Sequence, residues 1–172
     1  MSKKLWTIGH STHPIKEFIS ILHAYHIEML VDVRSLPGSN KFPQFNKENL
    51  EISLPKDGIS YKHLLILGGR RKVSKTSKNT AWNNLSFRGY ADYMATDDFK
   101  NGIEELKKLA ENKNVAIMCS EVLWWRCHRS MIADELKVQD WKVYHILSIT
   151  KADEHPYTSP AKVVNGILTY TG

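Results

Sequence analysis

The chain alternates between short apolar runs and longer stretches in which apolar residues recur every three or four positions. The apolar runs predict buried strands at residues 5–9, 28–34, 114–119 and 142–147. Apolar residues at helical spacing predict helices at about residues 14–26, 99–110 and 129–138. The first helix follows "STHP", where Ser or Thr can cap the start and Pro14 suits the first turn.

The order of these elements predicts an α/β fold. Strands that alternate with helices form βαβ units, so we expect a mainly parallel sheet with helices on both faces. A chain of 172 residues, 42% of them hydrophobic, suits one compact core, and we predict a single three-layer domain over residues 1–172. The stretch "LPGSNKFPQFN" (36–46) is rich in Pro, Gly and Asn and predicts a loop.

Polar residues stand at the carboxyl ends of the predicted strands, the edge at which open α/β sheets bind ligands. They are His10 after the first strand, Asp32 and Arg34 at the end of the second, Cys119 and Glu121 at the third, and His145 in or near the end of the fourth. Each has a structural alternative, such as an ion pair between Asp32 and Arg34. Their convergence from four segments nevertheless indicates an active site.

The formal charge of +6 and the sequence pI near 9.2 add a second feature, because the excess is unevenly placed. No acidic residue stands between Asp57 and Asp92, whereas seven Lys and Arg residues do. A polyanion such as nucleic acid would bind this stretch. The candidate contacts to its phosphates are Arg70, Arg71, Lys72, Lys75 and Lys78. The alternative is a solvated loop, since the stretch is also rich in Gly and Ser.

Other sequence features limit the compartment and the partners. No apolar run approaches the roughly 18 residues that span a bilayer, and "MSKKLWTIGHST" lacks the apolar stretch of a signal peptide. We therefore expect a cytoplasmic protein that does not bind membranes. Two cysteines eight positions apart do not make a disulfide framework, so reduced thiols are expected. The oligomeric state stays open.

The stretch "CSEVLWWRCHRS" (119–130) concentrates reactive residues. Zinc prefers ligands in compact pairs, whereas Cys119, Cys127 and His128 offer three at the wrong spacing, so neither a metal nor a cofactor is expected. A cysteine phosphatase needs five residues between Cys and Arg, but six separate Cys119 from Arg126. Cys127 could be a nucleophile, since it precedes a helix, although its neighbour His128 is expected to point elsewhere. Buried cysteines that only fill space are commoner.

The same stretch favours an anion pocket. "CHRS" opens a predicted helix, and helix N-termini present free N–H groups and positive potential to phosphates or carboxylates. His128 and Arg129 would add charge-assisted donors. The alternative is that Arg129 forms an ion pair with Asp134 or Glu121.

Five segments together resemble the successive motifs of the domain of unknown function 488 (DUF488) family, over about residues 7–147. They are "GHST", "DVRSLPGSNKFPQFN", "YKHLLILGG", "FRGYADYM" and "CSEVLWWRCHRSMIADEL". The resemblance implies a compact α/β fold with a shared polar pocket, and the family's name assigns no chemistry. The motif positions are His10, Ser11, Asp32, Arg34, Pro37, Phe45, Tyr61, Gly68, Gly69, Tyr90, Cys119, Glu121, Cys127, His128 and Arg129. The family usually has a polar, proline-containing turn where this chain has "VLWWR", so any role of Trp124 and Trp125 is particular to this protein.

A basic face, a phosphate-binding helix end and a pocket carboxylate together suggest an enzyme that acts on nucleic acid. Our leading hypothesis is a monofunctional DNA glycosylase that removes a damaged or modified pyrimidine, of the uracil or 5-hydroxymethyluracil type. Such an enzyme extrudes the base from the stack, stabilises oxocarbenium-like charge with a carboxylate and donates hydrogen bonds to the leaving base. Two alternatives stay open: a small-molecule or nucleotide enzyme that uses Cys119 or Cys127, and a noncatalytic nucleic-acid or protein binding module.

Each role in base removal has candidate residues. Asp32 or Glu121 would supply the catalytic carboxylate, and His10, Arg34 or Asn46 the donors to the base. The residues expected on loops near the pocket, where they would stack or form a wedge, are Phe42, Phe45, Tyr61, Trp124 and Trp125. The remaining candidates for substrate binding are Ser11, Cys119, His128 and Arg129.

Overall fold

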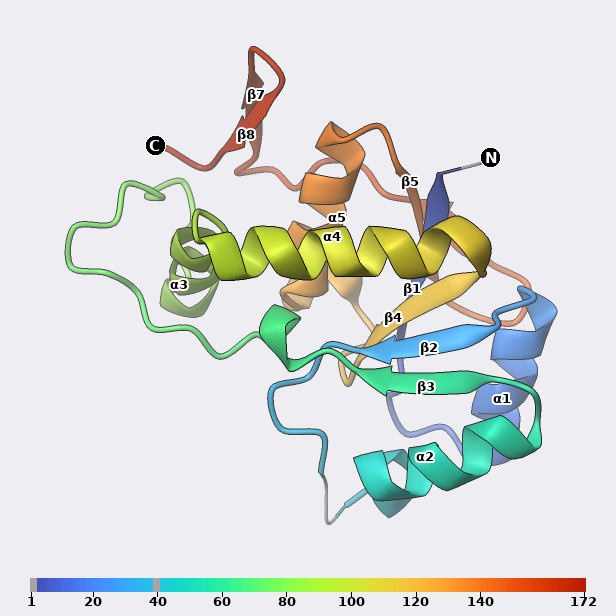
Figure 1. Cartoon of the computed structure of the whole chain (residues 1–172). Helices are drawn as coiled ribbons and strands as arrows, with labels where there is room; N and C mark the ends of the chain where they lie inside the picture. Colours follow the sequence, from blue (N-terminus) through green and yellow to red (C-terminus); the bar gives the residue numbers. More distant parts are fainter. Residues whose placement is uncertain (1–2, 39–40) are drawn as a thin grey trace.

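The structure, a computed structural model, describes residues 3–38 and 41–172, so part of the predicted loop, residues 39–40, lies outside the described residues. Within this range six strands form one sheet in the order β3-β2-β4-β1-β5-β6 (Figure 1). They are β1 (Lys4–Gly9), β2 (Met29–Asp32), β3 (Ser60–His63), β4 (Val115–Cys119), β5 (Lys142–Ile146) and β6 (Ala152–Glu154). The first five are parallel and β6 is antiparallel to β5, which confirms the mainly parallel sheet.

Helices cover both faces of this sheet (Figure 1). They are α1 (Ile15–Ala24), α2 (Lys47–Lys56), α3 (Leu85–Tyr93), α4 (Asp97–Asn112) and α5 (Arg129–Val138), with short 3-10 turns η1 (Pro43–Phe45), η2 (Leu65–Leu67) and η3 (Trp124–Arg126). α1 and α2 pack on one face, in a buried cluster that includes Phe18 and Leu50. α3, α4 and α5 pack on the other, in a cluster that includes Tyr90, Phe99 and Met131. The predicted α/β architecture with three layers is therefore confirmed.

The central strands are apolar on both sides because both sides are covered. In β2 and β4, Leu30 and Met118 enter the cluster under α1 and α2, whereas Val31 and Ile117 enter the opposite cluster. All residues of β4 are buried, as in other parallel strands between two helical layers. Burial of one such side chain stabilises the fold by about 1.5–3 kcal/mol. The carboxyl ends of these strands thus project from a firmly packed sheet.

Several elements were not predicted. β3 ("SYKH") is half-buried and has no apolar run, and α2 contains Pro55 and has little apolar periodicity. The strands β7 (Lys162–Val164) and β8 (Ile167–Thr169) form a hairpin whose turn residues Asn165 and Gly166 have φ of 52° and 76°. An Asn-Gly pair between apolar residues is a strong hairpin signal, so here the sequence did carry the information.

The predicted helices are found within a few residues of their expected ends. α4 begins at Asp97 because the side chain of Thr96 accepts a hydrogen bond from the N–H of Phe99 at 3.3 Å, which caps the first turn. Across the described part of the chain, no helix combines the length and the apolar character that crossing a bilayer requires.

Candidate active site

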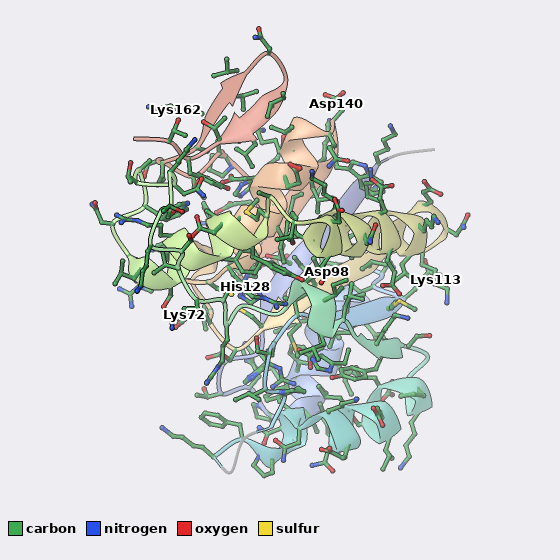
Figure 2. The ribbon with its side chains drawn as sticks, turned by 60° about the vertical axis from the view of Figure 1, so that its left-hand side comes forward. Lys72, Asp98, Lys113, His128, Asp140 and Lys162 are labelled. Carbon is green, nitrogen blue, oxygen red and sulfur yellow. The ribbon has the colours of Figure 1, made fainter. Side chains whose placement is uncertain are left out.

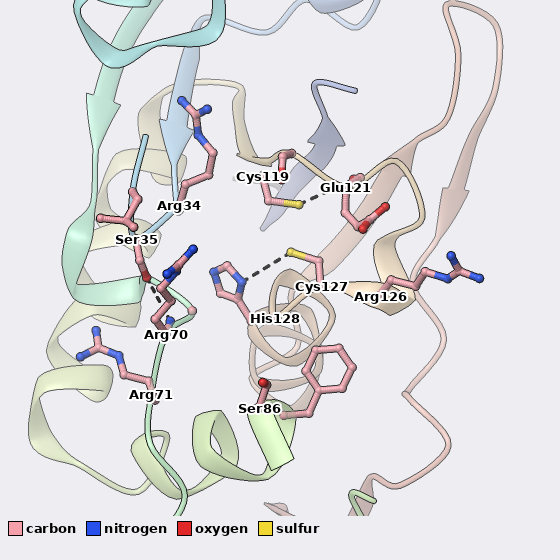
Figure 3. Close-up of a pocket in the computed structure, with 14 residues that line it drawn as sticks. Arg34, Ser35, Arg70, Arg71, Ser86, Cys119, Glu121, Arg126, Cys127 and His128 are labelled. Carbon is pink, nitrogen blue, oxygen red and sulfur yellow. Dashed lines mark hydrogen bonds between the residues drawn. The ribbon is translucent and has the colours of Figure 1, made fainter. Parts of the chain in front are cut away.

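The carboxyl ends of β2 and β4 and the start of α5 border a cavity of about 700 Å³ (Figure 3). Residues 69–71 and 86–87 complete its wall. An adjoining cavity of about 390 Å³ lies beside His10 and Phe42. Arg34 and Glu121 line both cavities. The hollow therefore lies where open α/β sheets bind ligands, and these two residues stand where its two parts meet.

Asp32 holds Arg34 in place. Arg34 donates to its carboxylate through the backbone N–H, Nε and Nη2, at 3.0, 2.9 and 2.7 Å. The hydroxyl of Tyr61 donates to the same carboxylate at 2.5 Å, and burial together with the Asp32 charge raises the pKa of Tyr61. Asp32 is fully buried, and neither of these two cavities has it in its wall. It is thus placed to position Arg34 and not to touch a ligand.

His10 completes the support of Arg34. Burial lowers the pKa of His10 to about 4, so the ring is neutral at pH 7. Its Nδ1–H donates to the carbonyl of Ser11 at 2.8 Å, which leaves Nε2 to accept from Nη1 of Arg34 at 3.3 Å. The ring of Phe45 stacks on the imidazole with centroids 4.2 Å apart, and the Phe45 carbonyl accepts from Arg34 Nη2 at 2.6 Å. The guanidinium is therefore fixed at the cavity wall by three neighbours.

Glu121 is the exposed carboxylate of this edge. It follows β4 and lines both cavities. A methyl group at Gly9 would overlap the Glu121 carbonyl oxygen, so only glycine at the end of β1 lets this segment pass so closely. The "GH" of the first motif therefore sets the place of Glu121 as well as that of His10.

Arg129 is fully buried, and its guanidinium faces sulfur and carbonyl groups. Nη1 donates to Sγ of Cys119 at 2.7 Å and to the Glu121 carbonyl at 2.5 Å, and Nη2 donates to the Val122 carbonyl at 2.9 Å. Among the described residues it makes no ion pair with a carboxylate. The expected alternative, a salt bridge to Asp134 or to the carboxylate of Glu121, is therefore wrong.

The two thiols lie together at the cavity wall. Cys119 and Cys127 are free and buried, and both line the large cavity, where Figure 3 shows them side by side. Burial opposes ionisation of Cys119, but the neighbouring Cys127 and the charge of Arg129 outweigh it and lower the Cys119 pKa to about 7. Burial and the neighbouring Cys119 raise the pKa of Cys127. Cys119 is thus the more readily ionised thiol of the pair.

His128 lies beside Cys127, contrary to the expectation that adjacent residues point apart. Cys127 is extended (φ −140°, ψ 152°) and His128 is helical, and this bend brings Nδ1 to 3.5 Å from Sγ of Cys127. Nε2 donates to the Val33 carbonyl at 2.8 Å, and burial lowers the His128 pKa to about 4. A methyl group at Gly69 would lie 2.6 Å from Nδ1, so the second glycine of "LGG" makes room for this ring.

The basic segment is anchored, and its residues differ in role. The carboxylate of Asp92 accepts from the Ser74 N–H, the Ser77 hydroxyl and the Asn79 amide at 2.5–2.8 Å. Arg71 serves the fold, because it stacks on Tyr93 at 3.6 Å and donates to carbonyls at the end of η2. Arg70 lines the large cavity, and Lys72, Lys75 and Lys78 are exposed, with Lys72 at the outer edge of the molecule in Figure 2.

Of the five aromatic candidates, Phe42 lines a cavity in the described part of the chain. Phe45 is fully buried, and Tyr61 lies on β3 and not on a loop, which corrects that expectation. Trp125 is 50% exposed but lies outside both cavities. Trp124 stacks on His145, and Asn46 is the N-cap residue of α2. Ser11 lines the smaller cavity.

His145 does not reach the sheet edge, which corrects its expected place in the site. It is fully buried, with Nδ1 2.6 Å from the Thr7 hydroxyl and Nε2 2.8 Å from Nδ1 of His155. Nε2 of His155 lies 2.8 Å from Asp134, which also accepts from the hydroxyl of Tyr170 at 2.7 Å. This chain of polar groups ties the C-terminal segment to β1 and α5.

Sequence reasoning missed several cavity residues: Ser35, Leu36, Ser86, Phe87 and Arg126. Leu36 and Phe87 belong to the quoted motifs "DVRSLP" and "FRGYADYM", so the motif match was the signal that could have found them. Leu36 lines both cavities and is 64% exposed.

The comparison with known families gave one match. The family model for a domain of unknown function, DUF488, matches residues 14–136, which include most of the cavity wall. No curated protein and no solved structure matched the chain.

Proposed function

Since this chain belongs to the DUF488 family, whose function is unknown, its activity has to be inferred from the site, and we propose that it is a monofunctional DNA glycosylase for a modified or damaged pyrimidine. The observation that carries this proposal is the joint position of Glu121 and Arg34 on the shared wall of two cavities. A carboxylate and a fixed cation facing one hollow are the two groups that cleavage of an N-glycosidic bond needs.

The cavities suit an extruded nucleotide. Base excision requires the target to leave the stack, and a volume of about 700 Å³ falls in the range of small-ligand sites. Phe42 in the smaller cavity offers an aromatic face to the base, and the exposed Leu36 is placed to fill the gap left in the duplex. Uracil and 5-hydroxymethyluracil are the bases we propose, since their carbonyl oxygens accept from the guanidinium of Arg34.

In this mechanism Glu121 acts on the sugar and Arg34 on the base. Water adds to C1′ of the deoxyribose as the bond from C1′ to the base nitrogen breaks, and Glu121 accepts the proton of that water. The base leaves with the electron pair, and Arg34 stabilises the negative charge that develops on its oxygens. Asp32 and His10 keep the guanidinium in position through their hydrogen bonds to it. Of the two carboxylates suggested by the sequence, Glu121 is therefore our catalytic candidate.

The basic segment supports DNA as the partner. Arg70 at the cavity wall and the exposed Lys72, Lys75 and Lys78 lie on one stretch of chain that leads away from the cavity. Its anchor at Asp92 presents these charges in a defined arrangement before any ligand arrives. Cations on an ordered segment beside the site would neutralise phosphates next to the extruded nucleotide.

The test is incubation of the purified protein with duplexes that each carry one modified pyrimidine, followed by alkaline cleavage of abasic sites. Glu121→Gln should retain DNA affinity and lose roughly two to three orders of magnitude in turnover, the scale of a lost electrostatic stabiliser. Glu48→Gln, an exposed carboxylate on α2, is the matched control and should keep full activity. Release of no base by the wild type, or full activity of Glu121→Gln, would refute the assignment.

A further inference from the structure

We propose that Cys119 and Cys127 form a reactive dithiol that reduces small disulfides bearing carboxylates, with Cys119 as the nucleophile and Cys127 as the resolving thiol. Removal of a base does not use either sulfur, so this activity is separate from the glycosylase proposal and does not rest on it. Both thiols line the large cavity, and a small reagent therefore reaches them from there.

The first support is the buried guanidinium of Arg129. Burial of a cation is costly unless an anion or a full set of hydrogen bonds compensates. Nε of Arg129 has no partner in the described residues, and Nη1 and Nη2 meet two carbonyls and the sulfur of Cys119. The sulfur, at 2.7 Å, is the one ionisable group among these contacts. As a thiol, Cys119 donates to the Glu121 carbonyl at 3.6 Å, and on ionisation it supplies the charge that balances Arg129.

The second support is the arrangement around Cys127. The backbone N–H of Arg129, at the start of α5, lies 3.5 Å from Sγ of Cys127, and Nδ1 of His128 lies 3.5 Å from the same atom. Because Nε2 of His128 donates to the Val33 carbonyl, Nδ1 of the neutral ring is the acceptor. Nδ1 of His128 therefore accepts a hydrogen bond from the Cys127 thiol and orients it, and the helix start favours the negative charge that develops on its sulfur when it attacks.

The third support is the charge of the cavity wall, which selects the substrate. Arg70 lines the cavity on the side opposite the thiols (Figure 3), and Arg34 lines it there too, with its charge paired to Asp32. Glu121 is the one carboxylate among the lining residues. A disulfide whose ends carry carboxylates gains attraction from this wall, and a cationic disulfide does not.

The reaction balances within these groups and the disulfide substrate. The thiolate of Cys119 attacks one sulfur of the substrate, which forms a mixed disulfide and expels the other half as a thiolate. The Cys127 sulfur then attacks Sγ of Cys119 and expels the second half as a thiolate, which takes up the proton that Cys127 loses. The substrate is reduced to two thiols, and the protein is oxidised to a disulfide between Cys119 and Cys127.

The test uses the full chain without DNA and two probes, dithiobis(nitrobenzoate), which is dianionic, and dithiodipyridine, which is neutral. Wild-type protein should release both halves of either probe and lose the mass of two hydrogen atoms, with the new bond mapped to the peptides of Cys119 and Cys127. Cys127→Ser should stop at the mixed disulfide on Cys119, and Cys119→Ser should react at least about tenfold more slowly, because the remaining thiol is mostly protonated.

The charge of the wall has its own control. Arg70→Gln should slow the dianionic probe several-fold relative to the neutral one, whereas Lys56→Gln, which removes the same charge from the far end of α2, should leave that ratio unchanged. Wild-type protein that retains both probe halves as separate adducts, or whose thiols react only after unfolding, would overturn the proposal. Neither result would bear on base release, which is measured with DNA and no disulfide.

Discussion

The ion pair between Asp32 and Arg34 makes the clearest energetic prediction. The substitution Asp32→Asn keeps the shape of the side chain and removes its charge. Arg34, whose side chain is 9% exposed, would then face His10, which is neutral, and the Phe45 carbonyl without a carboxylate. Removal of one partner of a buried pair leaves an uncompensated charge and costs about 3–5 kcal/mol. We expect a loss of that size in the free energy of unfolding.

Thermal and urea unfolding followed by circular dichroism measure this loss. For a domain of this size, about 2–4 °C of Tm accompanies each kcal/mol, so Tm should fall by roughly 6–20 °C. The double variant Asp32→Asn with Arg34→Gln removes both charges and should recover at least about 1 kcal/mol relative to the sum of the single variants. The matched control is Asp153→Asn, an exposed carboxylate on β6, which should change stability by less than about 0.5 kcal/mol.

Activity separates positioning from direct catalysis at Asp32. If Asp32 only positions Arg34, Asp32→Asn lowers turnover because the guanidinium moves. Arg34→Lys should then reproduce most of the turnover loss of Asp32→Asn. A stability loss below about 1 kcal/mol in Asp32→Asn, with turnover reduced by three orders of magnitude, would refute our reasoning. That result would return Asp32 to the role of the catalytic carboxylate.

Three further predictions follow from the site. The lowered pKa of Cys119, about 7 against an ordinary 9.0, means that its contribution to stability is full above pH 9 and lost as the pH falls through 7. The free energy of unfolding of the wild type should rise by about 2–3 kcal/mol from pH 7 to pH 9, and that of Cys119→Ser should stay flat. The same pH dependence in both proteins would contradict the lowered pKa of Cys119. Replacement of Lys72, Lys75 and Lys78 by Ala should flatten the slope of log K against log salt for DNA binding by roughly 0.9 per lost contact. An unchanged slope would favour the alternative that this segment is a solvated loop without DNA contacts. Gly69→Ala places a methyl group 2.6 Å from the half-buried imidazole of His128 and should lower stability by about 1–3 kcal/mol in thermal unfolding; a neutral effect would show that the ring moves freely.

Two features of the candidate site could be predicted from the sequence, namely the edge of the sheet and most of its motif residues. The strands that carry Asp32 and Cys119 are short apolar runs, and the topology of parallel strands places their carboxyl ends together. The motif match extended this to Gly69 and Tyr90, for which neither periodicity nor charge gives a reason. These features are local, since each depends on a few consecutive residues and their spacing.

The sequence by itself determined the α/β class, the mainly parallel sheet and the helices predicted at about 14–26, 99–110 and 129–138, because hydrophobic periodicity acts within one element. Only the tertiary structure decided that Asp32 faces inward while Glu121 faces the cavities, since both stand at strand ends and Asp32 meets a donor from another segment, Tyr61 of β3. It likewise decided that Arg129 meets a sulfur and not a carboxylate. Packing of segments that are distant in the sequence decides which side chains meet, and local sequence patterns do not specify that packing.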